Sequence, residues 1–193
     1  TFFVKEYLGL SAAFLASLCF WAGIPWVLKM PLGHLVDLIW RQKALLVYLG
    51  ASLIALSIAI MFGLVAHTEM LRALMPVENW YVLSVILAPV GYVIQDVVAD
   101  AMTVEAVPLF DDDGTPFPDK QIKAMHTTMQ TLGRFSIISG LVIVAALNIG
   151  IFDGVAELSA AEKVSIYSDI YQLAFLIPVI SVVGVTLGAA FLA

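Results

Sequence analysis

Apolar residues fall into five long runs that are separated by short polar stretches. The runs cover about residues 10–32, 44–65, 79–105, 125–152 and 170–193. A helix needs about 20 apolar residues to cross the hydrocarbon core of a bilayer, and each run reaches that length. The pattern therefore predicts an all-α fold: a polytopic helical bundle of five transmembrane helices, forming a single domain over residues 1–193.

Composition supports a membrane protein rather than a soluble one. Hydrophobic residues make up 62% of the chain, charged residues 12%, and the mean hydropathy is +1.01. A soluble domain of 193 residues could not bury that much apolar surface in one core. The net charge of -6 comes largely from acids in the predicted loops and does not indicate a nucleic-acid partner. The expected surroundings are a lipid bilayer.

The third run contains carboxylates where a membrane helix rarely has them. Asp96 and Asp100 lie inside the run, and Glu105 lies at its end. An Asp at the centre of a membrane helix costs roughly 2.5 to 3.5 kcal/mol, so the pair requires a partner, a water-filled cavity or a function. Asp100 lies four positions after Asp96, which places both on one helix face. Glu105 points to another side, and we expect it at the membrane surface.

Two cations are candidate partners for these carboxylates. At 1.5 Å per residue, Asp96 lies roughly 13 Å from Glu105, and Arg134 lies roughly 13 Å inside the fourth run. Asp100 and Lys29 are each about 6 to 8 Å from their helix ends, so they form a second candidate pair. Either pair could be purely structural, or it could be broken and remade by protons or by an anionic substrate.

Basic residues predict the orientation of the chain. They favour cytoplasmic positions in short loops. One side of the predicted bundle has Lys29, Arg41, Lys43, Lys120, Lys123 and Arg134, and the other has Lys5, Arg72 and Lys163. The excess predicts that residues 33–43 and 106–124 are cytoplasmic loops.

The first of these loops has a distinctive spacing. Gly33, Asp37, Arg41 and Lys43 stand in the sequence GHLVDLIWRQK. Glycine lets two helices approach closely, aspartate can cap a helix N-terminus, and a basic pair can anchor the loop to lipid or to acids. The spacing resembles the loop between the second and third helices of a major facilitator superfamily half, which implies a gating role for the four residues.

Two further stretches are similar to one family within that superfamily. IPWVLKMPLGHLVD, residues 24–37, and QDVVADAMTVE, residues 95–105, resemble the corresponding stretches of the folate-biopterin transporters. Met30 stands where that pattern has proline, and Val36 where it has a small hydroxyl residue. The resemblance implies that the five runs correspond to helices two to six of an N-terminal half. The first helix and the remaining half of the transporter are then expected outside this chain.

Some features predict no site of their own. The run Asp111–Asp113 followed by Gly114 lacks the ligand spacing of a calcium-binding EF-hand, so we expect a solvated acidic loop. The three histidines lie at separate helix ends without metal-ligand spacing. Gly184 and Gly188 have the spacing of a helix-packing pair.

The leading expectation is a secondary transporter that moves a small polar or anionic organic solute by alternating access. Folate or a pterin would fit the resemblance, and protons could be coupled through Asp96 or Asp100. No enzymatic residue set, cofactor or metal site is expected, and a bacterial inner membrane is the expected location. The alternative is a membrane scaffold or assembly factor that has the transporter fold without transport. Its partner would be a membrane complex, such as a pigment-protein complex.

Overall fold

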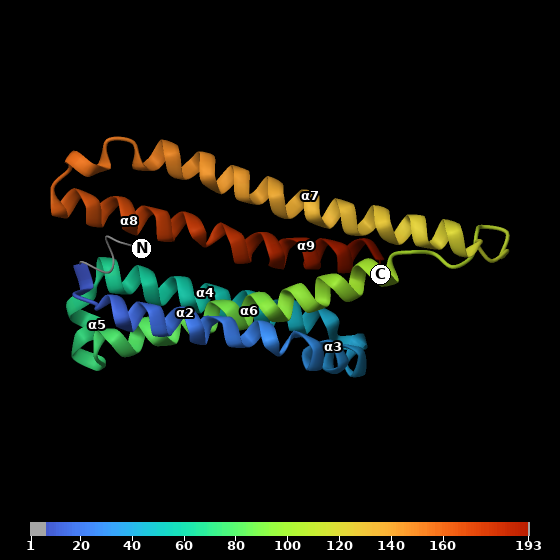
Figure 1. The fold of residues 1–193 in the computed structure, drawn as a ribbon, viewed down its shortest axis with the longest axis horizontal. Coiled ribbons are helices and arrows are strands. Elements are labelled where there is room, and N and C mark those ends of the chain that lie inside the picture. The colour runs from blue at the N-terminus through green and yellow to red at the C-terminus, as the bar shows by residue number, and fades with distance from the viewer. Residues whose placement is uncertain (1–6, 193) are drawn as a thin grey trace. The chain divides into compact units, whose positions relative to one another are not determined.

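The computed structural model describes residues 7–192, and its regular elements are helices (Figure 1). Lys5 and Ala193, which the sequence predictions include, lie outside the described residues. The α-helices are α2 (Ala12–Val27), α3 (Lys29–Leu38), α4 (Lys43–Ala66), α5 (Thr68–Leu74), α6 (Val77–Glu105), α7 (Asp119–Phe152), α8 (Ala160–Ala174) and α9 (Leu176–Leu192). Short 3₁₀ turns cover Trp40–Gln42 and Val155–Glu157.

Within residues 7–192, five helical spans are long and apolar enough to cross a membrane. They are Ala12–Leu38, Lys43–Ala66, Val77–Glu105, Asp119–Phe152 and Ala161–Gly188. The prediction of an all-helical chain with five candidate transmembrane helices is therefore confirmed. The first and last spans each combine two helices, α2 with α3 and α8 with α9.

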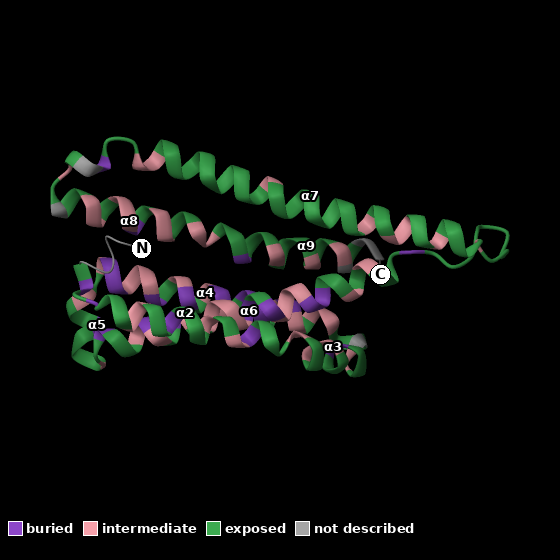
Figure 2. Ribbon diagram, viewed as in Figure 1, coloured by how far each residue is buried: buried purple, intermediate pink, exposed green. Residues whose placement is uncertain are grey.

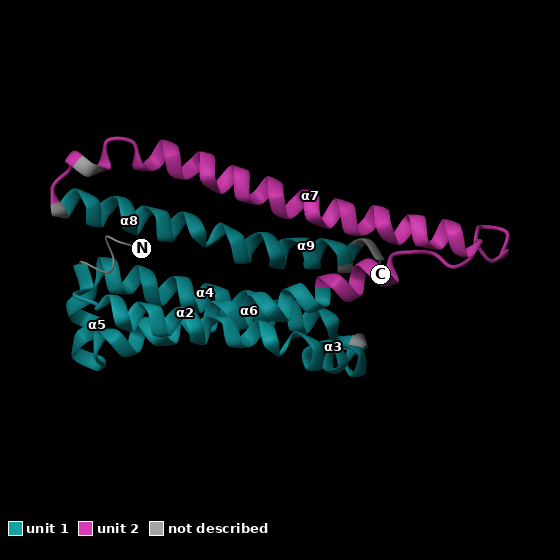
Figure 3. Cartoon of the chain, in the orientation of Figure 1, with its two compact units in different colours: residues 1–98, 160–193 teal, residues 99–159 magenta. Residues whose placement is uncertain are grey.

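The chain divides into two compact units (Figure 3). The first unit consists of Thr1–Val98 and Ala160–Ala193, and it contains α2 to α5, most of α6, and α8 with α9. The second unit, Ala99–Ser159, contains the last turns of α6, the segment that follows it, and α7.

In the first unit, α4 and α6 run antiparallel and touch at small residues. A Cβ atom added at Gly50 would lie 2.8 Å from the carbonyl oxygen of Gly91, and one added at Gly91 would lie 2.7 Å from that of Gly50. Real Cβ atoms do not approach backbone oxygens so closely, so both positions require glycine. Figure 2 shows buried residues along α4 and α6, where the two helices meet.

A pair of serines joins the same two helices further along. Ser57 Oγ donates to the carbonyl oxygen of Ser84 at 2.8 Å, and Ser84 Oγ donates to that of Ser57 at 3.1 Å. Both residues are buried. Such interhelical hydrogen bonds contribute about 0.6 kcal/mol each in membrane proteins, and here they also satisfy hydroxyls that lipid could not satisfy.

Prolines explain why the first and last spans are each divided. Pro31 lies four residues after Val27, where α2 ends, and Pro178 lies four residues after Ala174, where α8 ends. A proline has no N–H for the carbonyl four residues earlier, and its ring clashes with that carbonyl. The two helices therefore break at Leu28 and Phe175. Pro89 has no such effect, because α6 continues through it to Glu105.

Several predicted boundaries are wrong. The first helical span does not end near Leu32, because α3 continues to Leu38 and buries Val36. The polar link between runs two and three contains the helix α5, which packs Leu71 into the core of the first unit. The second predicted loop ends before Asp119, where α7 begins.

The last helical segment also begins earlier than predicted, because α8 begins at Ala160 rather than near Ile170. The charged residues of α8 suggested a polar stretch, but Val164, Tyr167 and Tyr171 recur at helical spacing and pack against the core. An amphipathic face thus extends the helix. Within the first unit, a Cβ at Gly184 or Gly188 would meet no atom within 4 Å, so the predicted packing of these glycines against another helix is not found there.

The glycine contact yields a stability prediction. Gly91→Ala should lower the free energy of unfolding by about 1 to 3 kcal/mol, because the new methyl group overlaps a backbone oxygen that cannot move aside without separating α4 from α6. Thermal unfolding of the purified protein in detergent measures the change. Gly23→Ala is the matched control, since nothing lies within 4 Å of its added Cβ. Equal midpoints for the two variants would contradict the close contact.

Candidate functional site

An ion pair lies beside the break between α2 and α3. Lys29 is the first residue of α3, directly after the break at Leu28. Its ammonium nitrogen lies 2.5 Å from Oδ2 of Asp96 on α6. The ion pair thus joins a broken helix to a continuous one, both within the first unit.

The two side chains are partly enclosed. The side chain of Lys29 is 38% exposed and that of Asp96 is 33% exposed. Oδ2 of Asp96, however, is fully enclosed and accepts no hydrogen bond from the described residues, although it touches the Lys29 ammonium. The contact joins two opposite charges, so its strength depends on both groups being ionised.

Depth along the helices explains why these two residues meet. Lys29 lies nine residues from the end of α3 at Leu38, and Asp96 lies nine residues from the end of α6 at Glu105. Each is therefore about 13.5 Å from its helix end at 1.5 Å per residue. This pair differs from the one predicted from the sequence, because the helix extends past Leu32 to Leu38 and Lys29 therefore lies further from its end.

The two other predicted acidic residues, Asp100 and Glu105, also lie on α6. Asp100 lies one turn after Asp96 on the same helix and is exposed, and Glu105 ends α6, as expected. Arg134 lies within α7. Asp100 and Arg134 belong to the second unit, so the pairing of Lys29 with Asp100 and that of Asp96 with Arg134 stay predictions.

A polar residue that the sequence reasoning missed lies next to Asp96. Gln95 Nε2 donates to the carbonyl oxygen of Val47 on α4 at 3.2 Å, and Gln95 Oε1 accepts from Ser181 Oγ on α9 at 3.5 Å. Gln95 thus links three helices. A polar amide inside an apolar run can be recognised in the sequence as readily as a carboxylate. The position of Gln95 was therefore the signal that could have identified it.

A second polar contact joins α4 to α9. The hydroxyls of Tyr48 and Thr186 lie 3.0 Å apart. Between this contact and Phe175, small and aliphatic side chains of the two helices line an apolar pocket of about 220 Å³. The α4–α9 contact is therefore less tightly packed than the α4–α6 contact.

The four residues predicted to form a gating loop do not all lie in a loop. Gly33 and Asp37 are inside α3, Arg41 is in the 3₁₀ turn, and Lys43 begins α4. A Cβ at Gly33 would lie 3.9 Å from Val97 of α6, an ordinary contact that does not require glycine. α4 begins without a side-chain cap, so Asp37 does not cap this helix. Asp37 and Arg41 line a shallow surface pocket together.

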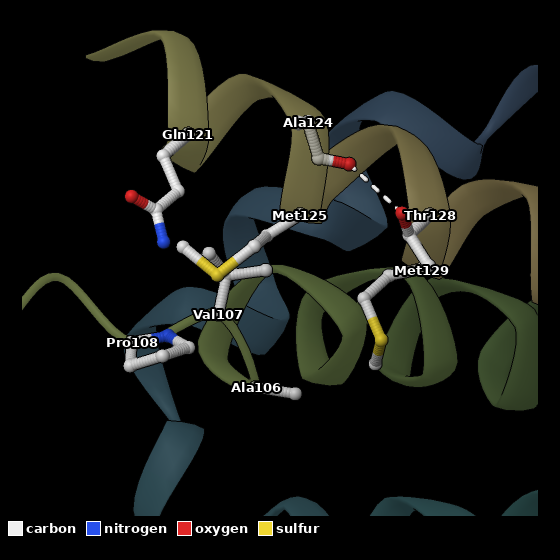
Figure 4. A pocket seen from close by; sticks show the side chains of 8 residues that line it. All are labelled: Ala106, Val107, Pro108, Gln121, Ala124, Met125, Thr128 and Met129. Atoms are coloured by element: carbon white, nitrogen blue, oxygen red, sulfur yellow. Dashed lines mark hydrogen bonds between the residues drawn. The ribbon is translucent and has the colours of Figure 1, made fainter. Parts of the chain in front are cut away.

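The second unit contains a separate pocket of about 300 Å³ (Figure 4). Val107 and Pro108 line one side, and Met125 and Met129 of α7 line the other. Thr128, also at the pocket, donates to the carbonyl oxygen of Ala124 in its own helix at 3.0 Å. The lining offers apolar contacts and little polar recognition.

The acidic segment in the second unit is organised by its own backbone. Oδ1 of Asp111 accepts hydrogen bonds from the N–H groups of Asp113 and Thr115, at 3.1 and 2.8 Å. Gly114 completes the turn with a φ of 78°. These bonds form an Asx turn, which engages one carboxylate oxygen. Among the described residues, no group of three His, Cys, Asp or Glu side chains is arranged to hold a metal ion.

A scan against protein-family profiles, a search of curated proteins and a search of solved structures each found nothing that matches this chain. Assignment to a transporter family is therefore a proposal, which rests on residues 24–37 and 95–105.

The ion pair can be tested by a double-mutant cycle with Lys29→Met and Asp96→Asn. The coupling energy should be about 1 to 2 kcal/mol, between the values for exposed and buried pairs, because both side chains are about one-third exposed. Unfolding of the purified variants in detergent measures it. The pair Glu69–Arg72, which is more exposed, is the control and should give below about 0.5 kcal/mol. Equal coupling in the two cycles would contradict a special role for Lys29 and Asp96.

Proposed function

We propose that this chain is part of a secondary active transporter that moves a small polar or anionic organic solute by alternating access. The observation that carries the proposal is the Lys29–Asp96 ion pair, which joins a broken helix to a continuous one within candidate membrane-spanning segments. Ionisable residues inside such segments are costly, and they mark solute and ion pathways in many membrane proteins.

The position of the pair supports this proposal. If the 29 residues of α6 are centred in a bilayer about 30 Å thick, the hydrocarbon core covers about 20 of them. Asp96 then lies about 7.5 Å inside the core boundary at 1.5 Å per residue. Transporters of this kind bind their solutes near the midplane, between two structural repeats, and broken helices contribute to the site.

The contacts that α6 makes with α4 and with α3 also support the proposal, because they differ in strength. The glycine contact and the serine pair hold α4 to α6 without space between their backbones. By contrast, α3 follows a break and is joined to α6 through a charge pair, which a proton or an anion can disrupt. We propose that α3 moves when the pair opens, while α4 and α6 move together as one body.

We further propose membership of the major facilitator superfamily, near the folate-biopterin transporters, and a location in a bacterial inner membrane. The stretches IPWVLKMPLGHLVD and QDVVADAMTVE support this, and they contain Lys29 and Asp96 respectively. In that reading, the remaining half of the transporter would complete the solute cavity.

Transport can be tested with the full-length protein in proteoliposomes. We expect uptake of at least one member of a panel of folate, pterins and organic anions when a pH gradient is imposed. Asp96→Asn should reduce gradient-driven uptake by about tenfold or more, a change of about 1.4 kcal/mol in the coupled step. Gly23→Ala is the control for reconstitution, since its side chain would meet no atom within 4 Å.

If wild-type protein carries no panel member although it is folded, the transporter proposal fails and the scaffold alternative is favoured. Co-purification of the folded protein with a membrane complex would then identify that alternative. If Asp96→Asn transports as well as wild type, transport stands but the role of Asp96 is wrong.

The proposed orientation can be tested by labelling single cysteines in a Cys19→Ser background. With five spans, Gln42→Cys and Asp112→Cys lie on one side and Glu69→Cys on the other. A membrane-impermeant maleimide added to intact cells should label Glu69→Cys, and should label the other two only after permeabilisation, because the basic residues favour a cytoplasmic side for them. Labelling of Gln42→Cys and Asp112→Cys from opposite sides would contradict the number of spans between them.

A further inference from the structure

The pocket of about 220 Å³ between α4 and α9 lies wholly within the first unit. Small residues of α4 line one side, and aliphatic residues of α9 line the other. Phe175 and Pro178 line it near the break between α8 and α9. Of the lining residues in the described chain, Ser52 alone has a polar side chain. The pocket is therefore an apolar space with one hydroxyl group on its wall.

The hydroxyl protons at this contact between α4 and α9 are already engaged. Ser52 Oγ donates to the backbone carbonyl oxygen of Tyr48 at 2.8 Å, and Thr186 Oγ1 donates to that of Val182 at 2.7 Å. Because a threonine hydroxyl has one proton, the Tyr48 hydroxyl is the donor in its 3.0 Å contact with Thr186. Ser52 thus presents the lone pairs of an acceptor to the pocket and has no proton left to donate.

The depth of Ser52 determines which molecules can reach it. α4 is a candidate membrane span of 24 residues, so it is about 36 Å long at 1.5 Å per residue. If α4 is centred in a hydrocarbon core about 30 Å thick, Ser52 lies about 10 Å inside the core boundary. A ligand of this pocket has to dissolve in hydrocarbon, and an ionised ligand is disfavoured by the cost of moving its charge there.

A neutral hydroxyl group is the best complement to an acceptor at this depth. In hydrocarbon a donor without an acceptor is unfavourable, so a hydroxyl group gains from a hydrogen bond to Ser52 Oγ. Amides and carboxylic acids also have a carbonyl oxygen, for which the described lining has no proton. A cavity of about 150 Å³ holds benzene, so one of about 220 Å³ holds about nine non-hydrogen atoms.

We propose that this pocket binds a lipid-soluble alcohol, whose hydroxyl group donates a hydrogen bond to Ser52 Oγ. The hydrocarbon part of the alcohol fills the space between α4 and α9 and stabilises their contact. This inference goes beyond the proposed transporter function and does not depend on it, because it concerns other helices than the Lys29–Asp96 pair and requires no solute to cross the membrane.

Binding can be tested with the full-length protein in lipid nanodiscs and two isomeric probes, n-octanol and heptyl methyl ether. The probes have the same atoms, but only the alcohol has a proton to donate. An octanol with a diazirine ring in its chain should, on illumination, label residues 51–55 of α4 or 179–183 of α9, and peptide mass spectrometry locates the label. Unlabelled octanol should suppress this labelling at a concentration about threefold to tenfold lower than the ether, the range expected for one hydrogen bond inside a membrane protein.

Substitutions at Ser52 isolate the hydrogen bond. Ser52→Ala should bring the ratio of the two competing concentrations to about one, because the acceptor is removed while the apolar space remains. Ser52→Thr should restore the preference for octanol, because its hydroxyl keeps an acceptor and can bond the carbonyl four residues earlier. The ratio compares two probes on the same protein, so a change in pocket volume affects both alike.

Filling the pocket tests its location. Ala55→Leu places a larger apolar side chain in the space and should abolish labelling of both segments. Ala59→Leu is the matched control, since Ala59 lies one turn further along α4 and outside the lining, and it should leave the labelling unchanged. The Ser52 variants decide the hydrogen bond even if Ala55→Leu does not fold.

Equal competition by octanol and the ether in wild type, or a preference for octanol that survives Ser52→Ala, would overturn the hydrogen bond on which the proposal rests. Labelling that misses both segments, or that persists in folded Ala55→Leu, would overturn the site itself. None of these measurements involves transport, so failure of this inference and failure of the transporter proposal are distinguishable.

Discussion

The contact between the backbones of Gly50 and Gly91 is the constraint on which the first unit depends. It brings α4 and α6 so close that no side chain fits between them, and it sets their antiparallel register. That register places Ser57 opposite Ser84 on one side of the contact and Val47 opposite Gln95 on the other. In lipid, where water cannot satisfy polar groups, each of these contacts depends on the same alignment.

The same alignment of α4 and α6 determines which helix Asp96 faces. Because Gln95 faces α4, the next residue on the helix is turned by about 100° and faces a different neighbour, α3. There Val97 approaches Gly33, and Asp96 meets Lys29. Pro31 causes α2 to end at Val27, and Lys29 is therefore the first residue of α3 rather than a residue in the middle of one continuous helix. The tightly packed pair α4 and α6 thus places the Asp96 carboxylate against α3, which is joined to α6 less rigidly.

The candidate site was partly predictable from the sequence. Asp96 and Lys29 were recognisable because charged residues are rare inside apolar runs. Their pairing was not, because GHLVDL contains a glycine, a histidine and an aspartate, a composition that favours a loop. The helix continues there because Val36 is buried, which is a tertiary contact. Gln95 is also a polar residue in an apolar run, but the sequence alone does not show which helices its amide contacts.

The sequence by itself determined that the chain is helical, that five segments are long and apolar enough to span a membrane, and which charged residues lie inside them. These properties follow from composition and from local hydrogen bonding, which every helix satisfies within itself. Only the tertiary structure decided which glycines of the first unit are contacts: Gly50 and Gly91 touch, whereas Gly184 and Gly188, with the more typical spacing, meet no other helix of that unit. It likewise decided that Lys29 meets Asp96, because helix rotation and register depend on how side chains from distant segments pack, and no local pattern contains that information.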